Sequence, residues 1–188
     1  MSLIRDYLSL VEKAMSELPE EKIRDVVETL KAAHADGRQV FLLGNGGSAA
    51  TATHLAEDLQ KGVRECTGRR FKVFSLAESA PLITAWANDT SYENVFAAQL
   101  DCLLEPGDVV VAISGSGNSP NVIKAVEKAN EMGAITIGWS GFAGGKLAQT
   151  ARKSIVVNSD NMQRIEDVHM ILGHLVVTCL MKECGRPG

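Results

Sequence analysis

The chain has 188 residues, of which 45% are hydrophobic and 22% charged, and its formal net charge is -4. This length and apolar content suit one domain with a sizeable core and are too small for two comfortable ones. The negative charge and the lack of a Lys/Arg-dense stretch argue against nucleic-acid binding, because non-specific affinity for DNA comes mostly from neutralising phosphates.

The expected location follows from the N-terminus and the cysteines. Residues 1–6 carry charges where a signal peptide needs an apolar core, and no apolar run approaches the length of a membrane span. The four cysteines show neither CxxC spacing nor the pattern of a disulfide scaffold: Cys66, Cys102, Cys179 and Cys184. We therefore expect reduced thiols in a soluble cytoplasmic protein without a membrane partner.

Two helices are predicted between residues 3 and 34. Apolar residues recur there every three or four positions, and Pro19 suits the start of a second helix. These helices carry more apolar surface than one thin layer needs, which predicts burial at a subunit interface. The residues concerned are Leu8, Val11, Met15, Val26, Val27 and Leu30.

The rest of the chain alternates between short apolar runs and helical segments. The runs are bounded by glycine or polar residues, as parallel strands buried on both faces are, and lie at 39–43, 71–76, 108–113, 134–139 and 154–157. Helices are predicted at 49–61, 80–88, 92–104, 121–132 and 162–182, with a helical turn near 145–150. This order predicts a three-layer α/β/α sandwich around a five-stranded parallel sheet. We expect one flavodoxin- or Rossmann-like domain over 1–188, with a helical extension at 1–35 and an α/β core at 36–188.

Two Gly/Ser loops each join a predicted strand to a predicted helix. The first reads GNGGS at 44–48 and the second SGSGNS at 114–119. Unpaired N–H groups and the positive end of the helix dipole favour an anion at such a turn, and serine hydroxyls add donors. Two such loops at one sheet edge predict a phosphorylated metabolite held across them.

A dinucleotide site is a weaker interpretation of the first loop. The sequence GNGGSA satisfies the permissive pattern GxGxxA, but that site also needs an acidic residue at the end of the next strand. Glu65 has roughly the required spacing yet precedes the strand, and Glu78 has the right place but comes late. The second serine loop is not part of that fingerprint.

Four motifs together resemble one known family. They are GNGGS at 44–48, Asn88-Asp89, SGSGNS at 114–119 and RIEDVH at 164–169 followed by His174. Over nearly the whole chain they are similar to the sugar isomerase (SIS) domain family and, within it, to the phosphoheptose isomerases. The resemblance implies conversion of sedoheptulose 7-phosphate to D-glycero-D-manno-heptose 7-phosphate in a homotetramer with active sites at subunit interfaces, and zinc in several members. It also implies substrate contacts at Asn45, Gly46, Gly47, Ser48, Asn88, Asp89, Ser114, Gly115, Ser116, Ser119 and Glu166.

The resemblance also implies the catalytic residues. The family's base is a glutamate four residues after a histidine, and here Asp58 stands four residues after His54. Glu166 takes the place of a family glutamine, and His174 matches the catalytic histidine. Residues at i and i+4 share a helix face, which is a common arrangement for two ligands of one metal.

We therefore predict a divalent metal, zinc or another first-row ion, held by His54, Asp58, Glu166 and His174. Glu166 and His174 lie about 12 Å apart along a helix axis and roughly 80° around it, so both would have to extend toward a shared ion. In the alternative interpretation, both histidines are partly buried packing residues and both acids are solvated.

The resulting hypothesis is an aldose–ketose isomerase of a phosphorylated sugar. Asp58 would be the base, His174 the acid, and the metal would polarise the two oxygens. Two alternatives stay open: an isomerase of another sugar phosphate, such as an amino-sugar or pentose phosphate, and a non-catalytic module that binds a sugar phosphate or a protein. His174 favours an enzyme, because the similar replication-initiator-binding proteins lack that histidine.

Overall fold

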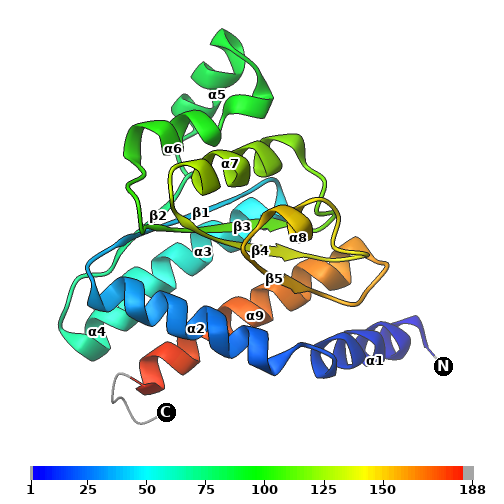
Figure 1. Ribbon diagram of the computed structural model, residues 1–188. Coiled ribbons are helices and arrows are strands. Elements are labelled where there is room, and N and C mark those ends of the chain that lie inside the picture. Colours follow the sequence, from blue (N-terminus) through cyan, green and yellow to red (C-terminus); the bar gives the residue numbers. More distant parts are fainter. Residues whose placement is uncertain (1, 184–188) are drawn as a thin grey trace.

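Five parallel strands form the centre of the molecule, in the order β2-β1-β3-β4-β5 (Figure 1). The computed structural model describes residues 2–183, so Cys184 lies outside the described residues. The predicted parallel sheet is confirmed, and every strand boundary lies within one residue of its predicted place. The strands are β1 (Gln39–Gly44), β2 (Lys72–Ser75), β3 (Val109–Ser114), β4 (Ile135–Ser140) and β5 (Lys153–Val156).

Helices cover both faces of the sheet, which confirms the predicted sandwich. One layer contains α2 (Glu20–Ala35), α3 (Gly47–Asp58) and α9 (Met162–Glu183), and the other contains α6 (Ala97–Leu103), α7 (Pro120–Glu131) and α8 (Leu147–Thr150) (Figure 1). Along β1, Val40 and Leu42 pack against the first layer, whereas Phe41 and Leu43 pack against the second. A strand buried on both faces therefore has a continuous apolar sequence.

The two N-terminal helices have different places. Helix α1 (Leu3–Ser16) projects beyond the sandwich and packs Val11 and Ala14 against the start of α9 (Figure 1). Helix α2 belongs to a core layer, because Val26, Val27 and Leu30 are buried within the chain itself. The prediction that these three residues and Val11 are buried at a subunit interface is wrong, because the chain itself covers them. The apolar residues that do stay exposed on α1 are Leu3, Ile4, Leu8 and Leu10.

Two predicted helices have different boundaries in the structure. Helix α3 continues into a π-helical turn, η1 (Leu59–Val63), and a short α4 (Arg64–Thr67). This wider turn keeps Leu59 and Val63 in the core, where both are at most 1% exposed. The predicted 92–104 helix divides into a 3₁₀ turn, η2 (Tyr92–Asn94), and α6, while α5 (Ala80–Asp89) has no buried residue and stands away from the sheet (Figure 1).

A membrane span was not expected from the sequence. Among residues 2–183, none of the helices is both long enough and apolar enough to cross a bilayer.

Candidate active site

The first Gly/Ser loop joins β1 to α3 in a backbone shape that needs glycine. Gly46 has φ +54°, a region that other residues rarely adopt. A Cβ atom at Gly44 would lie 2.8 Å from Ser48, so the chain can fold tightly back over the strand end. Ser48 is buried in the first turn of α3. The loop therefore presents the N-terminus of α3 at the carboxyl edge of the sheet.

The second loop joins β3 to α7 and is held by its own hydrogen bonds. The hydroxyls of Ser114 and Ser119 lie 3.1 Å apart in a hydrogen bond, and Ser116 Oγ accepts from the backbone N–H of Asn118 at 3.2 Å. The chain after β4 supports the loop, since the N–H of Leu147 donates to the carbonyl of Gly117 at 2.8 Å. Three serine hydroxyls are thereby gathered at one turn.

Gly117 lies where the segment after β4 packs so closely against the loop that no side chain fits. Its φ is +66°, and a Cβ atom there would lie 2.1 Å from the carbonyl oxygen of Gly144. We expect Gly117→Ala to lower the free energy of unfolding for two reasons. A left-handed backbone costs a residue with a Cβ atom about 1–2 kcal/mol, and the steric clash with Gly144 adds about 1–3 kcal/mol. Gly68→Ala is the matched control, because Gly68 has φ +68° with nothing within 4 Å. Urea unfolding measures both variants, and equal losses would contradict the clash.

A cavity of about 240 Å³ opens between the two loops and α9. Three helix N-termini meet there: Gly47 begins α3, Ser119 immediately precedes α7, and Met162 begins α9. The positive ends of their dipoles, together with the serine hydroxyls, favour an anion there without a cationic side chain. The residues that line the cavity are Asn45, Gly46, Gly47, Ser48, Ile113, Ser114, Gly115, Ser116, Ser119, Met162 and Glu166.

Helix α9 places two of its side chains directly against glycines of the loops. A Cβ atom at Gly115 would lie 2.3 Å from Met162 Sδ, and one at Gly47 would lie 2.5 Å from Glu166 Oε1. The Glu166 carboxylate therefore stands against the first turn of α3, inside the cavity. No sequence pattern indicates that Met162 lies in this wall, because its position depends on how α9 packs against the sheet.

Two residues expected to contact substrate lie elsewhere in this chain. Asn88 and Asp89 are at the exposed end of α5, where Asn88 Nδ2 donates to Asp89 Oδ1 at 2.8 Å. Neither lines the cavity. Asn45 does line it, but its side chain is bonded to Asn121 and Tyr92, two residues that sequence reasoning missed.

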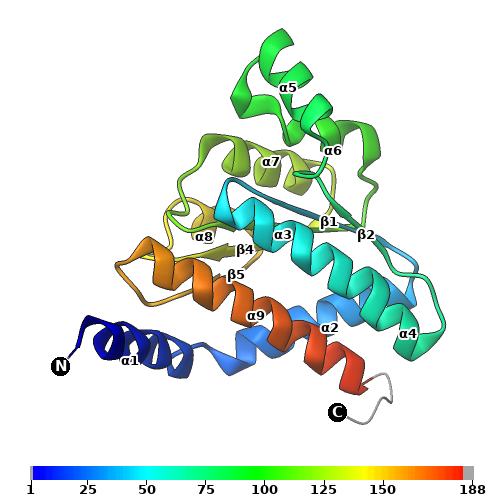
Figure 2. The same ribbon diagram turned by 180° about the vertical axis from the view of Figure 1, so that it is seen from behind.

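A second cluster lies further along α3 and α9, which run side by side (Figure 2). His54 and Asp58 are one helical turn apart on α3, and His174 faces them from α9. The Nε2 atoms of the two histidines are 3.0 Å apart, and Asp58 Oδ2 lies 3.4 Å from His54 Nε2 and 3.7 Å from His174 Nε2. The side chains of these three residues form a possible metal-binding group.

The donor spacing in this group fits a tetrahedral ion. Ligand atoms at about 2.0–2.2 Å from zinc stand roughly 3.3–3.6 Å apart in a tetrahedron, close to the three distances between these donors. Two neutral imidazoles and one carboxylate are also donors that first-row divalent ions accept. The side chains of His54 and His174 are about half exposed, which leaves further coordination positions open to solvent.

Glu166 was predicted as the fourth ligand, but the structure does not bring it into this group. Its carboxylate is at Gly47, seven residues before His54 along α3. Because Glu166 and His174 are eight residues apart on a straight helix, they face different parts of α3. The structure thus places Glu166 in the cavity between the loops and outside the possible metal-binding group.

His169 has the packing role that the sequence indicates. It is buried, and burial lowers the pKa of its imidazole to about 4, so the ring is neutral at neutral pH. Its Nε2–H donates to the carbonyl of Ser140 at 3.2 Å. This bond ties the middle of α9 to the end of β4 and helps to fix the helix that carries Glu166 and His174.

The fold is a three-layer α/β domain with a polar cavity at the carboxyl edge of its sheet, and the comparisons place that domain in a known family. The sequence model of the SIS domain family matches residues 5–141. A phosphoheptose isomerase from Aquifex aeolicus is 40% identical over 166 residues, which cover 88% of this chain and 86% of that protein. Another, from Geotalea daltonii, is 37% identical over 182 residues, covering 95% and 94%.

A solved structure agrees with these sequence comparisons. The phosphoheptose isomerase of Neisseria gonorrhoeae has a TM-score of 0.85 and 30% identity to this chain, covering 94% of it and 96% of the relative. The chain therefore belongs to the SIS domain family and, within it, to the family of the phosphoheptose isomerases.

Proposed function

We propose that the protein is a phosphoheptose isomerase, which interconverts sedoheptulose 7-phosphate and D-glycero-D-manno-heptose 7-phosphate. The observation that carries this proposal is the cavity between the loops, where three helix N-termini and four serine side chains meet, next to the helices α3 and α9 that also hold a possible metal-binding group. The cavity would hold the phosphate. The phosphate contacts would come from the two loops at 44–48 and 114–119, and Glu166 would face the sugar.

The distance between the two sites suits a long substrate. Glu166 at the cavity and His174 at the metal group are eight residues apart on α9, about 12 Å along the axis. An extended chain advances about 1.2 Å per bond, so the eight bonds from C1 to phosphorus of a heptose 7-phosphate span roughly 10 Å. A phosphate in the cavity would then leave C1 and C2 near His54, Asp58 and His174.

The chemistry assigned to these residues is a proton transfer between adjacent carbons. Starting from the ketose, Asp58 removes a proton from C1, the C1–C2 bond becomes a double bond, and His174 donates a proton to O2. His174, having given up its proton, then takes the proton from O1 as the C1–O1 double bond forms, and Asp58 returns its proton to C2, which gives the aldose and restores both residues. A bound divalent ion, which we propose to be zinc, would polarise O1 and O2 and stabilise the negative charge of the enediolate.

The direct test is isotope exchange. The metal-replete protein is incubated with sedoheptulose 7-phosphate and a panel of ketose phosphates in deuterated water, and NMR follows exchange at C1 and new signals at C2. Solvent deuterium in the product establishes the isomerase reaction and identifies the sugar. Binding without exchange of any sugar phosphate would contradict the proposal and indicate a non-catalytic module.

The serines of the loop at 114–119 should determine the affinity for the sugar phosphate. Ser119→Ala or Ser116→Ala removes one hydrogen-bond donor to an anion, which is expected to cost about 1.5–3 kcal/mol of binding. Calorimetry with the sugar phosphate should show this loss in both variants, while Ser16→Ala on the distant α1 leaves affinity unchanged. Unchanged affinity in both loop variants would remove the phosphate assignment.

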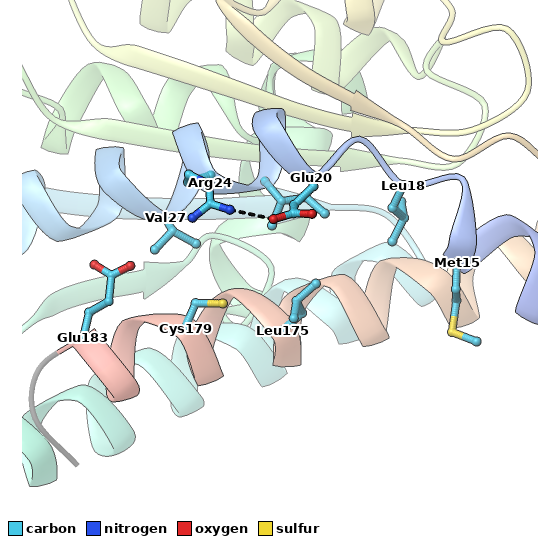
Figure 3. A pocket seen from close by; sticks show the side chains of 9 residues that line it. Met15, Leu18, Glu20, Arg24, Val27, Leu175, Cys179 and Glu183 are labelled. Atoms are coloured by element: carbon cyan, nitrogen blue, oxygen red, sulfur yellow. Dashed lines mark hydrogen bonds and ion pairs between the residues drawn. The ribbon is translucent and has the colours of Figure 1, made fainter. Parts of the chain in front are cut away.

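We also propose that copies of the chain assemble, with a homotetramer as the expected state. A cavity of about 330 Å³ lies between α2 and α9, and Met15 at the end of α1 also lines it (Figure 3). Its wall is mostly apolar around the Arg24–Glu20 ion pair: Met15, Leu18, Glu20, Ile23, Arg24, Val27, Leu175, Cys179 and Glu183. Apolar surface of this kind on α1 and α9 is suited to a second copy. Assembly would also let Asn88 and Asp89 reach a neighbouring site.

Light scattering tests the assembly. We expect a tetramer at micromolar concentration, and a smaller species for Leu8→Asp, because Leu8 is 61% exposed in the single chain and its change leaves the core intact. Circular dichroism checks that the variant stays folded. A monomeric parent protein would count against shared active sites.

A further inference from the structure

We infer that Asn121 is a positioning residue: by pairing with the side chain of Asn45 it sets the separation of the two phosphate-binding loops. The inference rests on the proposed function only in assigning the cavity to phosphate. Asn121 does not line the cavity, so any effect on a ligand must pass through Asn45 and the loops.

The two amides form a reciprocal pair across the loops. Asn45 Nδ2 donates to Asn121 Oδ1 at 2.8 Å, and Asn121 Nδ2 donates to Asn45 Oδ1 at 2.9 Å. Asn45 belongs to the loop between β1 and α3, whereas Asn121 lies in the first turn of α7, two residues after Ser119. The pair therefore joins the loop that carries Gly46–Ser48 to the loop that carries the other serines.

Two outer hydrogen bonds fix which way both amides point. The backbone N–H of Val122 donates to Asn121 Oδ1 at 3.0 Å, and the Tyr92 hydroxyl donates to Asn45 Oδ1 at 3.0 Å. Because a backbone N–H can only donate, the atom of Asn121 that it meets must be the oxygen, and the orientation of Asn45 follows. The Asn45 oxygen then has two donors, and only one N–H of its amide is left for a ligand.

Burial makes this arrangement stiff. Asn121 is 2% exposed, so neither of its polar atoms can exchange its partner for water at low cost. Tyr92, which lies in η2, makes the outermost hydrogen bond of this network. Its side chain is 55% exposed, so it can be changed without loss of core packing.

The test is Asn121→Asp, whose carboxyl group changes the pair with its protonation state. As a carboxylate it places an acceptor against Asn45 Oδ1, and the two oxygens repel. As a neutral acid it donates from O–H to that oxygen and restores a reciprocal pair of nearly the same shape. Burial raises the pKa of such a carboxyl group, so its change of protonation state falls within a pH range that binding experiments can cover.

The measured quantity is the ratio of the Kd of the variant to that of the parent for sedoheptulose 7-phosphate, from pH 5.5 to 8. We expect a ratio of about ten or more at pH 8, as one lost hydrogen bond to a buried group costs about 1.4 kcal/mol or more, and a ratio near one at the acid end. Asn121→Ala should weaken binding at every pH. Taking the ratio removes the titration of the phosphate itself, which the two proteins share.

The remaining outcomes are decisive. A ratio near one throughout, or a weak variant that does not recover in acid, overturns the inference. If circular dichroism shows that Asn121→Asp is unfolded, Tyr92→Phe decides: loss of its donor to Asn45 should raise Kd a few fold, and parental affinity would contradict the inference. A parent protein that binds no sugar phosphate contradicts the proposed function instead.

Discussion

Replacing His174 by alanine is expected to lower the rate of isomerisation by at least about a thousandfold, since a positioned general acid contributes roughly 10²–10⁴ and a metal donor is lost with it. His174 Nε2 lies within 4 Å of both His54 and Asp58. The side chain is 52% exposed, so its removal opens no core cavity. The change should therefore leave the fold intact while it removes the chemistry.

Deuterium exchange measures the rate, and elemental analysis measures the bound metal. Glu57→Gln is the matched control, because Glu57 precedes Asp58 on α3 but is turned about 100° away around the helix axis and lies outside the metal group. It should keep the parental rate. Parental turnover in His174→Ala would reject the assigned mechanism altogether.

The sheet and its loops could be predicted because their signals are local. Val40 to Leu43 form an unbroken apolar run because both faces of β1 are covered, and the loop that follows needs glycine to turn into α3. The pairing of His54 with Asp58 is equally local, since it depends only on the helix period. The geometry of this part of the site depends only on residues that are close together in the sequence.

The parts that sequence reasoning missed depend on how distant elements pack. Helix α9 returns so close to the loops that Gly47 and Gly115 are in contact with Glu166 and Met162. That approach places Glu166 in the cavity between the loops rather than beside His174, although both are on one helix. The pairing of Asn45 with Asn121 is of the same kind, because nothing in either segment indicates that the other faces it.

Asp58 is expected to act both as a ligand and as the base, and two substitutions separate these roles. Asp58→Asn keeps the shape but removes the negative charge and the proton acceptor, so turnover should fall by at least about a hundredfold and bound metal should decrease. Asp58→Glu restores the residue that the resemblance implies, and it should retain the metal with turnover preserved or shifted toward another sugar phosphate.

Glu166→Gln is the control that the structure supplies for the Asp58 variants. Glu166 is also acidic and was expected in the same metal set, but its carboxylate lies at Gly47, outside the metal group. Elemental analysis should therefore find parental metal in Glu166→Gln and reduced metal in Asp58→Asn. An inactive Asp58→Asn with parental metal would make Asp58 a base only, and parental turnover in that variant would show that another group removes the carbon-bound proton. Reduced metal in Glu166→Gln would instead show that Glu166 is a ligand. Its carboxylate would then have to move out of the cavity when the ion binds.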